Sequence, residues 1–150
     1  MFFEQYKVVE TLQIIKQIES EGCKNTIHKS DAIGCYGLRP MALKDIGINK
    51  IPFKYPVKLQ HEHALKYAKK ILSYSYNPTE DFLVYAWLNG PIAARKLQKS
   101  CKYGIIPYRN CFKDHWYNKR YDKLKTTQGT STYASFPSYE FLLFSQKVSY

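Results

Sequence analysis

A glutamate falls on the apolar face of the first helical pattern in the sequence. Val8, Leu12, Ile15 and Glu19 are spaced by 4, 3 and 4 residues, which places all of them on one side of a helix. Burial and the negative end of the helix dipole both disfavour the charged form, so we expect the pKa of Glu19 to be raised. A carboxyl group that stays protonated near neutral pH can protonate a glycosidic oxygen. The alternative interpretation is a solvated glutamate at a frayed helix end.

Many glycosidases place a second carboxylate opposite the acid, about 5 Å away for retention or roughly 6.5–9.5 Å away for inversion. The candidates in this chain are Glu21, Asp31 and Asp45. Glu21 is expected to be a solvated loop residue, as most glutamates outside helices are. Asp31 belongs to a loop that we expect near the cleft, so it is the preferred second carboxylate if the protein is a hydrolase.

The residue spacing supports metal binding and redox chemistry less well than it supports acid–base chemistry at Glu19. His61 and His63 flank Glu62, but side chains two residues apart on a helix point in different directions, and no third ligand is evident. We therefore expect no metal and no other cofactor. The cysteines lack Cys-x-x-Cys spacing and are either buried thiols or partners in up to two disulfides, whose pairing the spacing does not decide. They are Cys23, Cys35, Cys101 and Cys111.

Hydrophobic periodicity predicts a mainly α domain of about six helices with little or no sheet. Asn77 is the expected N-cap of one helix, with Pro78 at its first position and Glu80 completing a capping box. Residues 22–40 contain three glycines and one proline and are expected to form a loop. The predicted helices span residues 4–20, 40–47, 61–75, 77–89, 91–101 and 112–124.

Length and composition are those of a single globular domain. The chain has 150 residues, of which 45% are apolar, enough for a sizeable core. Its net charge of +11 favours a polyanionic partner: nucleic acid, an acidic membrane surface or an anionic wall polymer. A basic domain without such a partner is the alternative. We expect no membrane span, and the N-terminus lacks the pattern of a signal peptide.

Several short motifs follow one another in a familiar order. Glu19-Ser20 ends the first helix, "GCYGLRP" occupies residues 34–40 and "AWLNGP" occupies residues 86–91. A weaker motif, "DHWYNKRYDKL", covers residues 114–124. In this order they resemble the lysozyme-like lytic transglycosylases, whose Glu-Ser pair, Gly-Leu-Met-Gln-like segment and Ala-Tyr-Asn-Ala-Gly-Pro helix are similar. The resemblance extends over roughly residues 5–124.

The resemblance implies a lysozyme-like, transglycosylase-type domain over residues 1–125, followed by a Tyr-, Ser- and Thr-rich tail at 126–150. It also implies cleavage of the β-1,4 bond between N-acetylmuramic acid and N-acetylglucosamine in peptidoglycan, with Glu19 as the single catalytic acid and base. Gly37 stands where the family usually has Gln, and Trp87 replaces Tyr. Leu88 replaces Asn, although Asn89 can supply an amide one position later.

The resemblance also indicates which other residues line the sugar groove. Ser20 is expected either to orient the carboxyl of Glu19 or to cap the backbone. The aromatic candidates stack on sugars or belong to the core, and for Tyr85 the core is the better interpretation. Arg39 suits an anionic wall polymer. The expected substrate-binding residues are Ser20, Tyr36, Gly37, Arg39, Tyr85, Trp87 and Asn89.

Three other functions remain open from the sequence. A muramidase would hydrolyse the same bond, and a non-catalytic virion or tail protein would keep the fold for assembly or wall binding. A nucleic-acid-binding protein is disfavoured because no helix-turn-helix, zinc-finger or RNA-binding motif is visible. Without a visible signal peptide, we expect a bacteriophage protein that reaches the wall from the virion or at lysis. Its expected partners are peptidoglycan glycan strands and, through the tail, other virion proteins.

Overall fold

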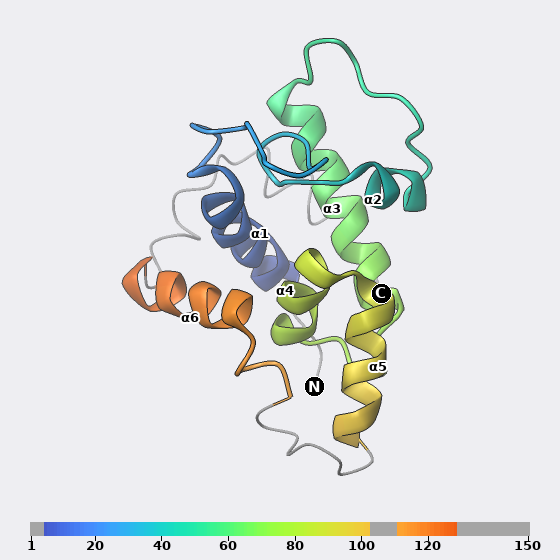
Figure 1. Cartoon of the computed structure of the whole chain (residues 1–150), viewed down its shortest axis with the longest axis vertical. Coiled ribbons are helices and arrows are strands. Elements are labelled where there is room, and N and C mark those ends of the chain that lie inside the picture. The colour runs from blue at the N-terminus through green and yellow to red at the C-terminus, as the bar shows by residue number, and fades with distance from the viewer. Residues whose placement is uncertain (1–4, 103–110, 129–150) are drawn as a thin grey trace.

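The computed structural model describes residues 5–102 and 111–128, and these are mainly helical (Figure 1). An isolated antiparallel bridge joins Ile33 and Leu38, and no strand is present within the described ranges. The expectation of a mainly α chain with little or no sheet is therefore confirmed. The helices are α1 (Gln5–Ser20), α2 (Pro40–Asp45), α3 (Val57–Ser73), α4 (Glu80–Asn89), α5 (Pro91–Lys102) and α6 (Trp116–Gln128).

Helix α4 is the centre of the packing. It contacts α1, α3, α5 and α6, and Figure 1 shows it between α1 and α5. Phe82, Leu83 and Val84 are completely buried, as expected for a helix that is apolar on all sides. Its N-cap is Thr79 and not Asn77, because the Thr79 hydroxyl accepts a hydrogen bond from the Phe82 amide at 3.2 Å.

The predicted boundaries of two helices were wrong. The second long helix begins at Val57, four residues before the predicted start at 61, because Pro56 already has the extended backbone of an N-cap. Helix α6 begins at Trp116 and ends at Gln128, four residues later at each end than the predicted helix at 112–124, and its last three residues belong to the expected tail. The rest of the tail, residues 129–150, lies outside the described residues.

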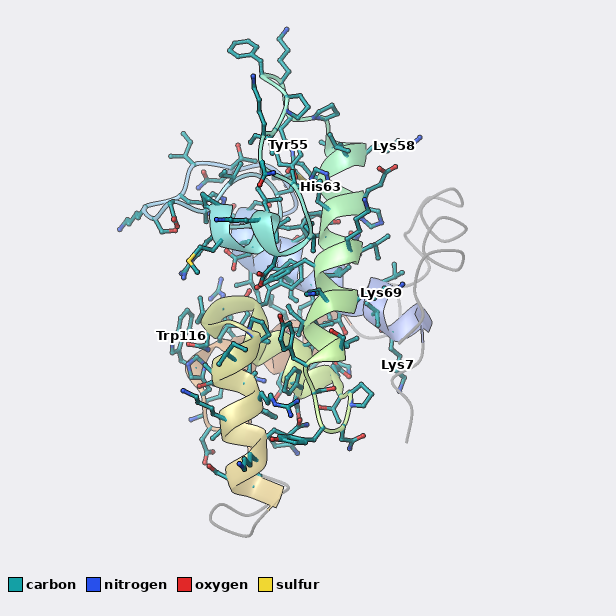
Figure 2. The ribbon with its side chains drawn as sticks, turned by 90° about the vertical axis from the view of Figure 1, so that its right-hand side faces the viewer. Lys7, Tyr55, Lys58, His63, Lys69 and Trp116 are labelled. Carbon is teal, nitrogen blue, oxygen red and sulfur yellow. A yellow bond between two sulfur atoms is a disulfide. The ribbon has the colours of Figure 1, made fainter. Side chains whose placement is uncertain are left out.

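The outer surface of the bundle carries many lysines. Lys7 of α1 and Lys58 and Lys69 of α3 are exposed and project from the same side of the molecule (Figure 2). Among the residues that the structure describes, no helix is both long and apolar enough to cross a lipid bilayer.

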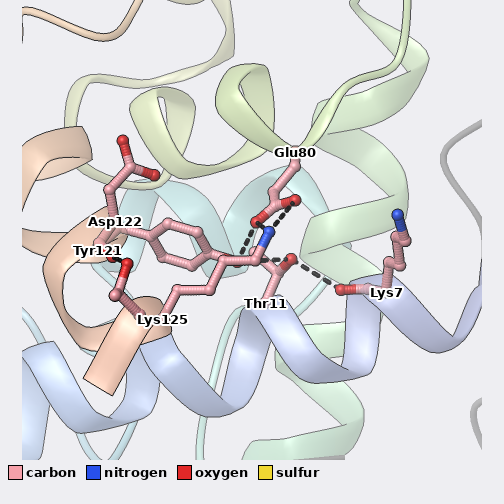
Figure 3. Close-up of polar contacts among 7 residues, drawn as sticks. Lys7, Thr11, Glu80, Tyr121, Asp122 and Lys125 are labelled. Carbon is pink, nitrogen blue, oxygen red and sulfur yellow. Dashed lines mark hydrogen bonds and ion pairs between the residues drawn. The ribbon is translucent and has the colours of Figure 1, made fainter. Parts of the chain in front are cut away.

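A polar cluster joins α6 to α1 and α4 (Figure 3). The hydroxyl of Tyr121 donates to Glu80 Oε1 at 2.6 Å and lies 3.1 Å from Thr11 Oγ1. Lys125 Nζ donates to both carboxylate oxygens of Glu80, at 2.7 and 2.9 Å. The proton of Thr11 goes to the carbonyl oxygen of Lys7 at 2.7 Å. One carboxylate therefore holds α6 on the rest of the bundle.

We expect Tyr121→Phe to lower the free energy of unfolding by about 1–3 kcal/mol, because it removes a buried hydroxyl that is bonded to a carboxylate. Urea denaturation measures this loss. Tyr74→Phe is the matched control, since the Tyr74 ring is only partly buried and lies under Lys70. Equal losses in the two variants would contradict the role given to the Glu80 cluster.

Candidate active site

Glu19 lies in the last turn of α1, and its side chain borders a pocket of about 190 Å³. The loop after α1 forms one wall of this pocket and the C-terminal end of α4 forms another. The pocket is lined by Glu19, His28, Lys29, Ser30, Ala32, Gly37, Arg39, Trp87 and Leu88. Glu19 is thus partly buried and still borders open space, as a group that transfers protons to a ligand must.

Burial raises the pKa of Glu19 above its ordinary value, which confirms the direction expected from the sequence. Three neighbours act against burial and lower the pKa of Glu19: the hydrogen bond from Tyr117, then the electrostatic interactions with His28 and Arg39. Because burial dominates, the protonated form is favoured more than in a solvated glutamate. Tyr117 lies on α6, whereas His28 and Arg39 lie between α1 and α2, so the balance depends on the tertiary fold.

Tyr117 on α6 is the site residue that the sequence analysis did not single out. Its hydroxyl donates a hydrogen bond to Glu19 Oε1 at 2.9 Å, and its side chain is 1% exposed. Burial raises the pKa of Tyr117 well above its ordinary value, so the hydroxyl keeps the proton that it donates. The only sequence signal was its place in the 114–124 motif, four residues before the buried Tyr121.

Gly37 lies directly against the carboxyl group of Glu19. Its φ of +61° is in the left-handed region, and a Cβ at this position would come within 2.5 Å of Glu19 Oε2. A glutamine, which the resembling family usually has here, would require the Glu19 side chain to move. The absence of a side chain lets the carboxyl group occupy its present position beneath the backbone of the turn.

Side chains from three helices hold this turn by its backbone. The Ser20 hydroxyl of α1 donates to the Cys35 carbonyl oxygen at 2.7 Å, and the Cys35 amide donates to Gln60 Oε1 of α3 at 2.6 Å. The indole N–H of Trp87 on α4 donates to the Tyr36 carbonyl oxygen at 2.8 Å. All these donors and acceptors belong to buried residues, so the turn that covers Glu19 is rigidly placed.

Ser20 and Tyr36 therefore have different roles from those assigned to them as substrate-binding residues. Ser20 is 2% exposed, and its hydroxyl also accepts from the Cys23 amide at 2.9 Å, so it caps the backbone. Tyr36 is also 2% exposed, and its hydroxyl lies 2.7 Å from His61 Nδ1 inside the core. Neither residue lines the pocket beside Glu19.

Trp87 and Arg39 lie where the sequence analysis expected them, beside the pocket. Trp87 lines the pocket with an 8% exposed side chain and packs against Tyr67, with ring centroids 5.2 Å apart. Arg39 is half exposed and lines the same pocket. Tyr85 instead packs on the far side of α4 against Phe112 and His115, with centroids 5.2 and 4.9 Å apart.

A second pocket of about 400 Å³ adjoins the first and shares Gly37, Arg39, Trp87 and Leu88 with it. Its further lining is mostly apolar and includes Met41, Ala42, Tyr67, Ile92 and Ala93. Asn89 also lines it, as expected for an amide on the groove. Together the two pockets form a groove that is basic on the side of the 28–32 loop and apolar beyond Trp87.

Of the three candidates for a second carboxylate, the preferred one, Asp31, does not line the groove. Asp31 is an exposed residue that forms a 3.9 Å ion pair with Arg39, and it lines neither pocket. Asp45, at the end of α2, lines the larger pocket. Glu21 is exposed, as expected, with a left-handed φ of 52°. Asp45 is therefore the better-placed second carboxylate, because it borders the groove.

The two histidines of the His-Glu-His segment bond to separate tyrosines. His61 lies beside Tyr36, whereas His63 Nδ1 is hydrogen-bonded to the Tyr55 hydroxyl. Burial lowers the pKa of His61 to about 4, so the imidazole is neutral. Within residues 5–102 and 111–128, no three His, Cys, Asp or Glu side chains come together as a metal site.

The structure pairs all four cysteines. Cys23 is joined to Cys35, and Cys101 is joined to Cys111. The first disulfide connects Cys23, three residues after the end of α1, with the turn over Glu19, and the loop that it closes carries His28 and Lys29. It therefore restrains one wall of the pocket.

Comparison of the chain with protein-family models, with curated proteins and with solved structures finds no match.

We expect Glu19→Gln to become more stable than the wild type as the pH rises. The folded state holds the Glu19 proton more tightly than the unfolded chain, since its pKa is raised. That contribution is complete below the unfolded pKa of about 4.5 and is lost as the pH rises through the folded pKa. Glutamine has no such proton, so the difference in melting temperature should be small near pH 4 and should grow towards about pH 8.

Thermal melts of the two proteins across this pH range measure the effect. Glu21→Gln is the control, because Glu21 lies two residues away and is exposed. A melting difference that does not change with pH, or one that is matched by Glu21→Gln, would contradict the buried, protonated state of Glu19.

Proposed function

We propose that this protein is a peptidoglycan lytic transglycosylase that cleaves the β-1,4 bond between N-acetylmuramic acid and N-acetylglucosamine, with Glu19 as acid and base. The observation that carries the proposal is the setting of Glu19. Its pKa is raised by burial, it borders an open groove, and a buried tyrosine on a distant helix orients it. The order of the Glu19-Ser20, 34–40 and 86–91 motifs supports the same activity.

In the proposed reaction, protonated Glu19 first gives its proton to the glycosidic oxygen, and the bond from that oxygen to C1 of the muramic acid breaks. The ionised Glu19 then takes the proton of the muramic 6-hydroxyl, and that oxygen bonds to C1. The product is a 1,6-anhydro sugar, and no water is consumed. Glu19 ends protonated, so a single carboxyl group is sufficient for the whole cycle.

The neighbours of Glu19 fit both of these states. The Tyr117 hydroxyl donates to Oε1, which leaves Oε2, on the side of Gly37, to exchange the proton. After the first step the carboxylate is stabilised by the hydrogen bond from Tyr117 and by electrostatic interactions with His28 and Arg39. Burial therefore raises the pKa of Glu19, and the groups that support the base limit that increase.

The basic side of the groove suits an anionic wall polymer. His28, Lys29 and Arg39 line the pocket beside Glu19 and would face the acidic peptide stems that muramic acid carries. The proposed setting is a bacteriophage protein that acts on the host wall from the virion or at lysis. Hydrolysis of the same bond is the second candidate, and Asp45 rather than Asp31 would then be tested as the second carboxylate.

We expect purified peptidoglycan treated with the protein to release muropeptides about 18 Da lighter than hydrolytic products, because ring closure replaces one water. Mass spectrometry of the released fragments measures this. Glu19→Gln should release none, and Glu21→Gln should be as active as the wild type. Reducing-end products that depend on Glu19 would instead establish a muramidase. Absence of release from several wall types would overturn the enzymatic proposal and leave a wall-binding or assembly protein.

We expect Gly37→Ala to reduce muropeptide release about 100-fold, because the methyl group displaces the Glu19 carboxyl and small misplacements of a catalytic group have effects of this size. Gly47→Ala is the matched control. Gly47 also has a positive φ, of 81°, but a Cβ there meets nothing within 4 Å. Both variants carry backbone strain of about 1–2 kcal/mol, whereas only the first disturbs Glu19. Equal rates in the two variants would contradict this role of Gly37.

A further inference from the structure

The chain between α2 and α3 carries an exposed aromatic residue among lysines. Phe53 is 100% exposed, and Val57, four residues later, is 52% exposed. Lys50, Lys54 and Lys58 are exposed around them, and no acidic residue occurs between Asp45 and Glu62. We call residues 46–58 the Phe53 loop. Figure 1 shows this segment projecting beyond the helices, with the N-terminal end of α3 at its base.

The base of the Phe53 loop is fixed to the bundle. The Tyr55 hydroxyl is hydrogen-bonded to His63 Nδ1, and the two side chains lie together beside the first turns of α3 (Figure 2). The Tyr55 carbonyl oxygen accepts from Gln60 Nε2 at 2.8 Å. Ile51 packs against the hydrophobic core. Since residues on both sides of Phe53 are anchored, the exposure of Phe53 is built into the loop and is not the result of fraying.

What distinguishes Phe53 from the other exposed apolar residues is a second exposed apolar side chain, Val57, nearby in sequence and three exposed lysines in the same segment. The lysines alone would suit any polyanion, including a wall polymer or nucleic acid. A fully exposed Phe with an exposed Val nearby, surrounded by lysines, suits an apolar phase that lies directly below a layer of negative charge. An anionic lipid bilayer provides both, because its phosphates attract lysines and its acyl boundary accepts aromatic rings.

We propose that the Phe53 loop docks on the surface of an anionic phospholipid bilayer. Phe53 and Val57 enter the boundary between headgroups and acyl chains, while Lys50, Lys54 and Lys58 contact lipid phosphates. This is peripheral attachment and requires no helix that spans the membrane. It does not rest on the proposed enzymatic activity, since the loop lies outside both pockets of the groove.

The anchoring contacts also connect the loop to the groove. Gln60 donates to the Tyr55 carbonyl oxygen and accepts from the Cys35 amide, at 2.8 and 2.6 Å. One buried side chain therefore joins the base of the Phe53 loop to the turn that covers Glu19. Docking of the loop would hold the groove in a fixed orientation relative to the bilayer.

Co-sedimentation of the full chain with vesicles tests the proposal. Vesicles of phosphatidylcholine with phosphatidylglycerol should bind the protein, and vesicles of phosphatidylcholine alone should bind it at least about tenfold more weakly. Each lysine near an anionic surface contributes roughly a fivefold change in partition, so Lys50→Gln, Lys54→Gln and Lys58→Gln together should weaken binding about 100-fold. Phe53→Ala should weaken it by roughly fivefold.

Two control variants distinguish the contribution of the Phe53 loop to vesicle binding from the contributions of overall charge and of exposed apolar residues elsewhere. Combined Lys96→Gln, Lys99→Gln and Lys123→Gln removes the same charge from exposed positions on α5 and α6, and Ile27→Ala removes another exposed apolar side chain, one that lines neither pocket. Both should bind nearly as well as the wild type. Thermal melts of all variants verify that each is folded, so a loss of vesicle binding reports on the surface.

The Phe53→Trp variant measures directly whether the side chain at position 53 enters the lipid bilayer. Its additional fluorescence, relative to the wild type with Trp87 and Trp116, should shift to the blue with anionic vesicles and stay unchanged with soluble dextran sulfate. Absence of vesicle binding would overturn the proposal. Equal losses of vesicle binding in the two triple-lysine variants would also overturn it. So would a Phe53→Ala variant that weakens binding to dextran sulfate as much as binding to vesicles. Either result indicates attraction to any polyanion.

Discussion

The backbone of one turn, residues 33–38, is the feature on which the rest of the site depends. Ser20, Gln60 and Trp87 come from three different helices, and each uses a buried polar group to bind this turn. A buried donor or acceptor that loses its partner costs about 1–3 kcal/mol, so the three contacts reinforce one another. Gly37 within the turn then sets the position of Glu19, because no side chain separates the backbone from the carboxyl group. The turn can form a wall of the pocket because side chains from three helices hold it in one position.

The burial that raises the pKa of Glu19 does so by destabilising its ionised form. The fold limits this cost by pointing the Tyr117 hydroxyl at Oε1 and by placing His28 and Arg39 nearby. Tyr117 can do so only while α6 stays docked, and the Glu80 cluster with Tyr121 and Lys125 holds α6 at its other end. Stability and the proposed chemistry are thus coupled through one helix, which explains why a cluster distant from the groove bears on Glu19.

Local patterns were sufficient for some of the site and failed for the rest. The spacing from Val8 to Glu19 predicted an inward glutamate with a raised pKa, because helix periodicity and burial are properties of a single segment. For Ser20 and Tyr36 the sequence left two alternatives, and both residues are buried: Ser20 caps the backbone and Tyr36 belongs to the core instead of the groove. Asp31 was preferred over Asp45 from its loop alone, whereas the two pockets place Asp45 on the groove. In each case the answer depends on contacts with segments that are distant in sequence, and a local pattern does not specify those contacts.

The amino-acid sequence alone specified the helices, the loop after α1 and the inward direction of Glu19, since these follow from periodicity, glycine and proline within short windows. Tertiary structure alone decided that Tyr117, 98 residues away, donates to Glu19. It also decided that Cys23 pairs with Cys35, that Trp87 bonds to the turn, and that Phe53 is left in solvent. The physical reason is that hydrogen bonds, pKa shifts and exposure depend on distances between segments, and those distances are set only when α1, α3, α4 and α6 pack together.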